Sequence, residues 1–465
     1  MNYQFKILEK DFVCLKEHLY PGDHKEAISI AICGRTNNGT TFLVHKIINI
    51  PHEQCERKPD FIRWPTSLIL DELPMLVRKN LAVFKIHSHP GGYSQFSELD
   101  DESDLEFFES IYGWFDSNDL HGSLVLLPDD NFFGRVVTEN FNFEKINRFS
   151  VVGKMLGITD ADKNLVVSNL EANLRNIQTL GKGTQKLLGQ MQIGVVGCSG
   201  TGSPVIEQLA RLGVGRLVLV DPDKVEQKNL NRIINTKQVD AENQAYKVDV
   251  IKQAIDKMGF NTMVTTFKSN LYEDLIAIET LSNCDFLFGC MDSIDGRHLL
   301  NCISSFYLIP YLDIGVKIIS DKKGGLDQIC GTTHFLLPGE SSLQTRGVYT
   351  HEELRSANLL RVDKAEFEEQ KRSGYIVDVD VEAPAVISIN MQAASLAVNE
   401  FLSRIHPIKV DDIEEFDIIR FSLTDFYFIN QKSNDPIDTY LLKYIGRGIM
   451  NPLLNMPNFS HEAVI

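Results

Sequence analysis

The fold of the second half of the chain is decided by the stretch Ile193-Gly-Val-Val-Gly-Cys-Ser-Gly-Thr-Gly-Ser203. A short apolar run, residues 193–196, meets glycines at 197, 200 and 202. This pattern is typical of the strand, turn and helix of a nucleotide-binding βαβ unit. Gly197, Gly200 and Gly202 let backbone amides approach a phosphate, and a helix N-terminus favours negative charge. A second apolar run ends at Asp221, whose carboxylate can accept hydrogen bonds from both ribose hydroxyls.

The residues after Asp221 decide between two kinds of nucleotide site. Ser199 stands at the middle glycine of the G-x-G-x-x-G fingerprint, and the glycines alone leave a nicotinamide or flavin domain open. Asn229, Arg232 and Lys247 add an amide donor and two cations. A triphosphate needs such groups and hydride transfer does not. The combined pattern therefore favours ATP.

From about residue 173 to about residue 405 the chain resembles the ThiF/MoeB/ubiquitin-activating enzyme superfamily. The resemblance is carried by Gly197–Ser203, Asp221-Pro-Asp223, Asn229-Leu-Asn-Arg232, Lys247 and Gly289-Cys-Met-Asp292-Ser. It implies ATP-dependent adenylation of the C-terminal carboxylate of a ubiquitin-like protein, with Asp223 in the ATP site and Asp292 coordinating Mg²⁺ at the phosphates. It also implies a homodimer in which Arg175 of one subunit reaches the ATP of the other. A surface arginine on an amphipathic helix is the alternative for Arg175.

Strand and helix signals alternate through residues 191–410 and predict a Rossmann-like, doubly wound, mainly parallel sheet. The expected strands are Leu217–Val220, Met263–Phe267, Phe286–Gly289 and Tyr311–Ile314, and the expected helices are Tyr246–Met258, Arg297–Phe306 and Val386–Ile405. The polar stretch Lys145–Leu180 predicts a linker helix, so residues 151–190 are assigned to this linker and to the helix that carries Arg175. Residues 411–465 are interpreted as a C-terminal docking tail, within which the aromatic-rich run Phe416–Ile429 is strand-like.

A second chemical pattern lies near the N-terminus. A predicted strand, Leu81–Ile86, ends in His87-Ser-His89-Pro90, and the alternation of an extended chain puts both imidazoles on one side. Ser97-Glu-Leu-Asp100 follows and opens an acidic helix. Two imidazoles and one carboxylate are three ligands for a zinc ion that keeps an open fourth position. Ser97-x-x-Asp100 is also a helix capping box, and both interpretations can hold together.

The complete spacing from His87 to Asp100 resembles the JAMM metalloprotease signature. This family hydrolyses amide bonds to remove ubiquitin-like modifiers, so residues 1–150 are expected to form an α+β JAMM-type domain. By the same resemblance, Glu26 at the start of an early strand is the general base, and Ser97 orients the tetrahedral intermediate. A surface glutamate at a strand start is the alternative for Glu26.

The positions of the cysteines do not decide whether the protein forms a thioester with its substrate. Thioester-forming activators need a cysteine in the crossover loop, and beyond Pro310 the sequence offers only Cys330. Strand-like sequence flanks it, so an inert thiol is the alternative. The zinc-binding cysteine pair of related chains is replaced in Pro338-Gly-Glu-Ser-Ser-Leu-Gln-Thr345. No structural zinc is therefore expected in this domain.

Composition and charge limit the partners and the compartment expected for this protein. The formal net charge of −17 disfavours nucleic acid or an anionic membrane as a partner. No apolar run reaches the roughly 18 residues of a membrane helix, and the first residues lack a signal-peptide core. The eight cysteines are scattered without a C-x-x-C pair. This usage predicts a reducing, cytoplasmic setting with most thiols buried.

The sequence thus predicts a bifunctional enzyme of a bacterial ubiquitin-like pathway, with a conjugating enzyme as a candidate partner. One centre would use zinc to trim or remove the modifier, and the other would use ATP and Mg²⁺ to activate its C-terminal glycine. An alternative substrate is a sulfur-carrier protein of cofactor or cysteine biosynthesis. An alternative of another class is a nicotinamide-dependent oxidoreductase or a nucleotide-binding scaffold.

Overall fold

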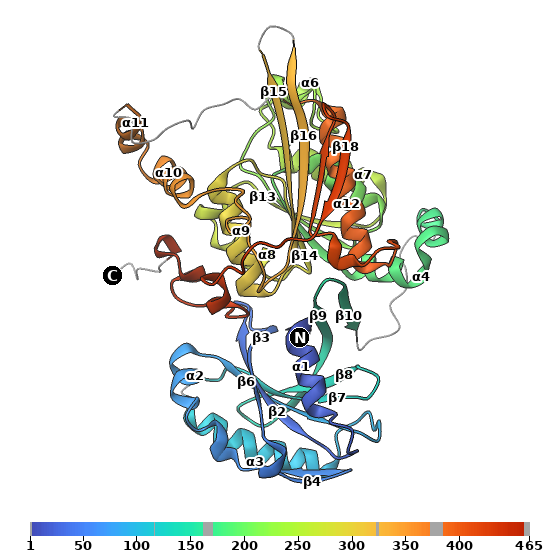
Figure 1. Ribbon diagram of the computed structural model, residues 1–465, viewed down its shortest axis with the longest axis vertical. Helices are drawn as coiled ribbons and strands as arrows, with labels where there is room; N and C mark the ends of the chain where they lie inside the picture. The colour runs from blue at the N-terminus through green and yellow to red at the C-terminus, as the bar shows by residue number, and fades with distance from the viewer. Residues whose placement is uncertain (1, 116, 161–170, 322–324, 373–384, 460–465) are drawn as a thin grey trace. The chain divides into compact units, whose positions relative to one another are not determined.

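The computed structural model describes residues 2–115, 117–160, 171–321, 325–372 and 385–459 (Figure 1). The chain divides into two compact units. The first comprises Met1–Asn164, Phe306–Leu308 and Tyr444–Ile465, and the second comprises Leu165–Ser305 and Ile309–Lys443. The tail assigned to residues 411–465 is therefore divided, because its first part belongs to the second unit and its last part belongs to the first.

The first unit is built on a sheet that closes on itself. Its strand order is β1-β3-β2-β6-β7-β8-β9-β10, and β1 also pairs with β9. The strands are β1 Tyr3–Leu8, β2 Ile28–Arg35, β3 Thr41–Asn49, β6 Ala82–Ser88, β7 His121–Leu126, β8 Phe132–Val137, β9 Phe143–Val152 and β10 Leu156–Asp160. The remaining elements are α1 Glu9–Leu19, α2 Leu73–Lys79, α3 Glu98–Trp114 and the hairpin of β4 Glu56–Lys58 with β5 Phe61–Arg63.

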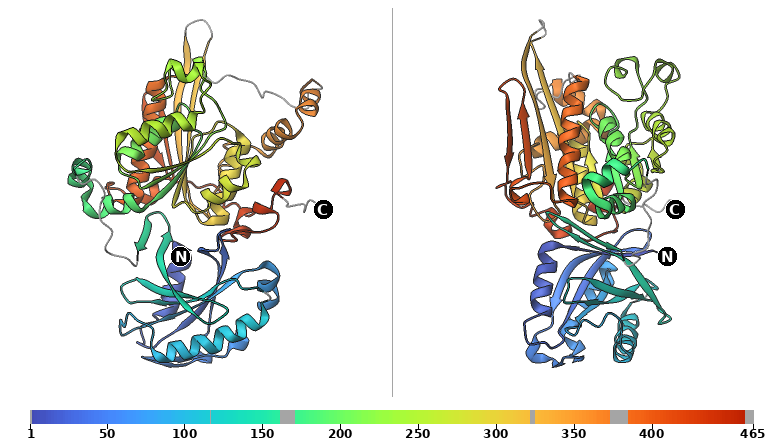
Figure 2. Two further views of the ribbon diagram at one scale, coloured as in Figure 1. Left: turned by 180° about the vertical axis from the view of Figure 1, so that it is seen from behind. Right: turned by 90° about the vertical axis from the view of Figure 1, so that its right-hand side faces the viewer.

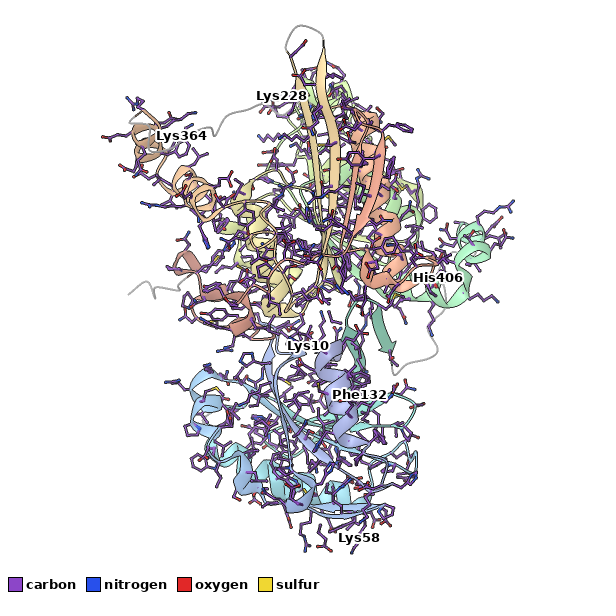
Figure 3. The ribbon with its side chains drawn as sticks, viewed as in Figure 1. Lys10, Lys58, Phe132, Lys228, Lys364 and His406 are labelled. Atoms are coloured by element: carbon purple, nitrogen blue, oxygen red, sulfur yellow. The ribbon has the colours of Figure 1, made fainter. Side chains whose placement is uncertain are left out.

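Strand β2 separates two apolar cores because it is buried on both faces. Ile28, Ile30 and Ile32 pack in the core that α3 covers with Phe107 and Phe108, and Figure 2 shows α3 lying along this part of the unit. The alternate residues of β2, including Ala31 and Cys33, face the other core, which α1 joins. Phe132, labelled in Figure 3, contacts the rings of Phe5 and Phe149 in this second core.

The linker helix expected from Lys145 is wrong over its first part. Residues 145–152 lie in β9 and residues 156–160 form β10, so the part of the 151–190 linker up to Asp160 is strand. Ile146, Phe149 and Val152 of β9 are buried, and the strand pairs with β1, β8 and β10. Tertiary pairing has overridden the helix-like composition. Residues 161–170 of the linker lie outside the described residues, and α4 occupies Leu174–Gln190.

The second unit contains a mixed eight-stranded sheet in the order β13-β12-β11-β14-β15-β16-β17-β18. The first five strands in this order are parallel, as expected, and the last three pair antiparallel, which the sequence patterns do not predict. The strands are β11 Gln192–Val196, β12 Arg216–Val220, β13 Met263–Phe267, β14 Phe286–Gly289, β15 Tyr311–Ser320, β16 Leu326–Leu336, β17 Ile418–Ser422 and β18 Tyr427–Gln431.

Helices connect the parallel strands and flank the sheet. They are α5 Gly202–Arg211, α6 Gln238–Glu242, α7 Lys247–Met258, α8 Leu275–Leu281, α9 Ile294–Tyr307, α10 His351–Val362, α11 Lys364–Arg372 and α12 Ile387–Ile405. The predicted helices that begin at Tyr246, Arg297 and Val386 are confirmed within a few residues. From β11 the chain adds β12 and β13 on one side, and it then adds β14 and β15 on the other side. Ligands of such sheets bind beyond the carboxyl ends of the strands at this point, between β11 and β14.

The final segment of the described chain completes the first unit. Gly34 N donates to Gly446 O at 3.1 Å, and Ile449 N donates to Arg35 O at 2.7 Å. Gly446 and Gly448 have φ of +60° and +62°, and a Cβ at Gly448 would collide with the carbonyl oxygen of Arg35. Both glycines are therefore required where this segment crosses the edge of β2.

Two expectations about the whole chain can be compared with the structure. All eight cysteines are free thiols, and five of them are buried, as predicted. Among the residues that the structure describes, no helix combines the length and apolar character needed to cross a membrane.

Candidate functional site

A cavity of about 540 Å³ opens beyond the carboxyl ends of β11, β12 and β14 in the second unit. Residues from several predicted loops meet there although they are far apart in sequence. The predicted nucleotide and magnesium residues that line it are Gly197, Gly200, Asp221, Asp223, Asn229, Arg232, Lys247 and Asp292. These predicted residues supply two cations, three carboxylates and part of a glycine-rich turn, a set that suits a nucleotide phosphate chain with a divalent metal.

Asp221 ties the end of β12 to the glycine-rich turn. Its Oδ2 accepts a hydrogen bond from Cys198 N at 2.7 Å, and its Oδ1 accepts one from Asp223 N at 2.9 Å. Lys247 Nζ lies 2.6 Å from Asp223 Oδ2 and 3.8 Å from Asp221 Oδ1. Burial raises the pKa of Asp221, and the nearby ammonium of Lys247 opposes that rise. The lysine therefore favours the ionised form of this carboxylate against the effect of burial.

The turn that carries Asn229 and Arg232 is organised by a reciprocal cap. Asn229 Oδ1 accepts from Glu226 N at 2.9 Å and so closes the short 3₁₀ turn Gln227–Asn229. Arg232 Nη1 donates to the carbonyl oxygen of Lys228 in the same turn. Asn229 is 4% exposed, whereas Arg232 is half-buried. Asn229 therefore orders the turn that presents the Arg232 guanidinium.

The two inner glycines of the fingerprint have different roles. Gly202 does not line the cavity, and a Cβ there would collide with Gly197 O, so its smallness serves the close approach of helix and strand. Gly200 lines the cavity and faces α12, where a Cβ would collide with Asn390 Nδ2. Asn390 is 4% exposed and lines the same cavity. Its sequence signal is a polar residue on the apolar stripe of a long helix.

The loop between β14 and α9 carries the predicted magnesium ligand. Asp292 is exposed and lines the cavity. Gly296 N donates to Ser293 Oγ at 3.3 Å, so Ser293 caps α9. On the next turn, Arg297 Nε lies 3.2 Å from the buried carboxylate of Asp313. Burial raises the pKa of Asp313, and the Arg297 guanidinium opposes that rise.

Two predicted catalytic residues lie away from this cavity in the protomer. Arg175 is exposed on α4, and its Nη1 donates to Gln178 Oε1 at 3.0 Å. Cys330 lies in the middle of β16, opposite Lys317 and Ser422. Neither residue is among those that line the described cavity. A role for Arg175 in a second subunit and a thioester on Cys330 both stay predictions.

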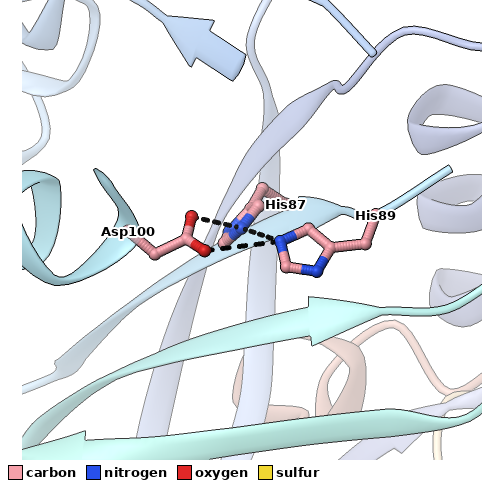
Figure 4. A group of neighbouring side chains, drawn as sticks. All are labelled: His87, His89 and Asp100. Atoms are coloured by element: carbon pink, nitrogen blue, oxygen red, sulfur yellow. Dashed lines mark hydrogen bonds and ion pairs between the residues drawn. The ribbon is translucent and has the colours of Figure 1, made fainter. Parts of the chain in front are cut away.

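The first unit brings His87, His89 and Asp100 together (Figure 4). His87 Nε2 lies 2.9 Å from Asp100 Oδ1, and His89 Nε2 lies 3.5 Å from Asp100 Oδ2. The two Nε2 atoms are 3.1 Å apart. His89 Nδ1 lies 2.7 Å from Tyr93 O, a contact that places the proton on Nδ1 and leaves the Nε2 lone pair for a metal. Two imidazole nitrogens and one carboxylate converge, and this donor set fits zinc.

Ser97 and Asp100 form the expected capping box of α3. Asp100 N donates to Ser97 Oγ at 3.1 Å, and Asp100 Oδ2 accepts from Ser97 N at 2.7 Å and from Ser97 Oγ at 2.8 Å. The other oxygen, Oδ1, faces His87. Asp100 thus directs Oδ1 at His87, while its cap oxygen Oδ2 also lies 3.5 Å from His89 Nε2. The capping and ligand interpretations are geometrically compatible.

Glu26 lines the same cavity as His87, Ser97 and Asp100, which has a volume of about 350 Å³. Its side chain is 6% exposed, and burial raises the pKa of its carboxyl to about 8. Its backbone is fixed by the β4–β5 hairpin, because Glu26 N donates to Lys58 O and Arg57 Nε donates to Glu26 O. A surface position for Glu26 is therefore wrong. A buried carboxyl that faces the candidate metal centre is placed as a general base requires.

Comparison with known proteins shows which class of domain the second unit contains. Residues 170–320 match the model of the ThiF family. The ubiquitin-like modifier-activating enzyme 5 of Culex quinquefasciatus is 26% identical over 196 residues, which cover 40% of this chain and 47% of that protein. The adenylyltransferase and sulfurtransferase MOCS3 of Danio rerio is 32% identical over 123 residues, or 26% of each chain. The second unit therefore contains a ThiF-type domain related to these activating enzymes.

The curated matches are partial, because the chain spans about half or less of the length of the relatives named above. Among solved structures, E. coli MccB with succinimide is 16% identical and has a TM-score of 0.42. That comparison covers 61% of this chain and 75% of that one.

Proposed function

We propose that the chain is a bifunctional enzyme that both activates and processes a ubiquitin-like protein. The ThiF-type domain would adenylate the C-terminal glycine of that protein with ATP. The first unit would hydrolyse the amide bond that follows the same glycine. The observation that carries the proposal is the gathering of Gly197, Asp221, Arg232, Lys247 and Asp292 in one cavity.

In the adenylation step, the substrate carboxylate attacks the α-phosphorus of ATP. The bond between the α- and β-phosphates breaks, and pyrophosphate leaves with the negative charge. Lys247 and Arg232 would attract the phosphates, and Asp221 would accept the ribose hydroxyls. Asp292 would hold Mg²⁺, which neutralises charge on the leaving pyrophosphate. The glycine-rich turn supplies the backbone amides at the phosphates.

In the hydrolytic step, Glu26 would accept a proton from the attacking water and pass it to the leaving amine. The Ser97 hydroxyl, whose single proton is donated to Asp100 Oδ2 in the structure, would turn that proton to the developing oxyanion while its oxygen still accepts from Asp100 N. His87, His89 and Asp100 would hold zinc, which supplies Lewis acidity in this family of reactions. The burial of Glu26 supports this role, because Glu26 lines the same cavity as His87 and Asp100.

One assay pair tests the proposal. ATP–pyrophosphate exchange is measured with candidate ubiquitin-like proteins that end in glycine, alongside variants that lack the last glycine. Cleavage is measured with the same proteins extended by a reporter after the glycine. We expect exchange that requires the terminal glycine and cleavage that stops with 1,10-phenanthroline. A chain that catalyses neither reaction with any such partner contradicts the proposal.

A sulfur-carrier substrate is the second candidate, and the similarity to an adenylyltransferase and sulfurtransferase favours it. The adenylation chemistry is the same in both cases, so exchange alone does not separate them. A conjugating enzyme that accepts the activated protein would favour the modifier pathway, as would recovery of an amide-linked product. Formation of a thiocarboxylate with a sulfurtransferase would favour the sulfur carrier.

A further inference from the structure

Helix α10, His351–Val362, begins with a complete capping box but has no buried residue. Thr350 Oγ1 accepts from Glu353 N at 3.1 Å, and this cap fixes the start of the helix. Figure 1 shows α10 and α11 to one side of the strands of the second unit. A helix without a buried apolar face gains little from packing. Its docking therefore depends on a few side chains at its ends.

The side chain of Arg361, in the last turn of α10, reaches back to two residues of the nucleotide cavity. Its guanidinium carbon lies 3.7 Å from the centre of the Tyr272 ring. Its Nε lies 3.2 Å from Asp295 Oδ2. Tyr272 and Asp295 are joined to each other, because Tyr272 Oη donates to Asp295 O at 3.1 Å. These contacts form a closed triangle of an arginine, a tyrosine and an aspartate.

Tyr272 and Asp295 line the cavity, but Arg361 does not. Tyr272 comes from the loop that follows β13, and Asp295 lies in the first turn of α9, three residues after Asp292. The charge of Arg361 is directed to Asp295, whose side chain is 13% exposed, and its planar face covers the ring. The arginine thus acts on the cavity through the two residues that it holds.

We propose that Arg361 is a positioning residue for the nucleotide site and couples the docking of α10 to nucleotide binding. The proposal rests on the proposed use of the cavity for ATP. When nucleotide orders the Tyr272 loop and the start of α9, the surface that receives Arg361 is ordered with them. By linkage, docking of α10 then strengthens nucleotide binding by the same factor that nucleotide strengthens docking.

The test compares R361Q, R361K and R355Q in the full chain. R361Q keeps a planar polar group but removes the charge, and R361K keeps the charge but loses the planar stack. Arg355 is exposed on the same helix and serves as the matched control. Calorimetry gives the Kd for MgATP, and hydrogen–deuterium exchange follows residues 351–362 with and without nucleotide. Pyrophosphate exchange gives KM and kcat separately.

We expect R361Q to raise the Kd and KM for ATP about 3- to 10-fold, the range of one cation–π contact with its ion pair. Its kcat at saturating ATP should stay near that of the wild type. MgATP should slow exchange in α10 of the wild type and of R355Q, but not in R361Q. R361K should restore part of the affinity. A merely structural role would lower kcat and stability without separating the two exchange patterns.

The outcomes separate this proposal from the proposed function. Equal ATP affinity and equal nucleotide-dependent protection in R361Q and the wild type would overturn the coupling while adenylation stands. Binding of MgATP without pyrophosphate exchange would overturn adenylation and leave the coupling measurable by calorimetry. A wild-type chain that binds no MgATP would overturn both. If R361Q fails to fold, R361K decides, because loss of protection supports the coupling and full protection with wild-type affinity overturns it.

Discussion

Asp100 has two tasks in the first unit, and replacing it by asparagine should separate them. The carboxylate has two acceptor oxygens, of which Oδ2 closes the cap of α3 and Oδ1 faces His87 at 2.9 Å. Asparagine has one acceptor oxygen. If that oxygen keeps the cap, the amide NH₂ group points at the imidazole nitrogens as a donor. The D100N variant should therefore keep the helix and lose the metal centre.

D100N and the companion variant S97A should affect different properties. D100N should lower mainly zinc affinity, and S97A should lower mainly stability. Loss of an anionic ligand should weaken zinc binding by more than about 100-fold, because changes in supporting partners alone give about 10–100-fold. The stability cost of D100N without metal should be about 0.3–1 kcal/mol, from the lost charge at the helix N-terminus. S97A removes the cap hydrogen bond and should cost about 0.5–2 kcal/mol. It keeps all three ligands and should lower zinc affinity by about 10-fold.

Two measurements on the full chain, of zinc affinity and of stability, check this difference between D100N and S97A. Zinc affinity is read by competition with a chelating dye. Stability is read in urea with a chelator present, through the fluorescence of Trp64 and Trp114, which are the only two tryptophans and both lie in the first unit. If D100N binds zinc as tightly as S97A does, Asp100 is not a ligand and the metal centre is refuted. If S97A leaves stability unchanged, the capping argument is wrong.

Four further substitutions test the separate parts of the molecule. Glu26→Gln should abolish amide-bond cleavage, keep bound zinc and leave pyrophosphate exchange unchanged; loss of exchange would show that the two centres are not independent. Asp292→Ala should remove exchange and keep cleavage, and residual exchange above about 10% would argue against its role at the metal. Asn390→Ala should raise the KM for ATP, measured by exchange, by about 5-fold through loss of one polar contact, whereas substitution of the exposed neighbour Met391 should not. Gly448→Ala should lower the stability of the first unit in the tryptophan assay by about 1–3 kcal/mol. Gly113→Ala, at a glycine with open space around it, should have little effect in that assay.

The local parts of both sites could be predicted from the sequence. His87, His89 and Asp100 lie on one strand end and the following helix start, so spacing alone brings them close. Gly197 and Asp221 follow adjacent parallel strands, whose carboxyl ends meet at one edge of the sheet. Periodicity also located the parallel strands and the main helices, because each has a regular apolar pattern.

Features that depend on distant partners were not predictable in this way. Asn390 joins the cavity only because α12 packs against the glycine-rich turn, and no local pattern specifies that contact. The stretch from Lys145 to Asp160 looked helical but became strand, because β1 and β8 offered backbone partners. The strand-like run Phe416–Ile429 does contain β17 and the start of β18, but its antiparallel pairing with β16 was not predicted, because the partner strand lies far away in the sequence.

The order in which the two units use the chain has a consequence for folding during translation. The first compact unit borrows residues 444–459, which a ribosome adds only after the whole ThiF-type domain has been made. Early in translation the edge of β2 lacks the hydrogen bonds that Gly446 and Ile449 later supply. A nascent chain that stalls midway therefore exposes an unfinished first unit, and its last folding step waits for synthesis of the ThiF-type domain.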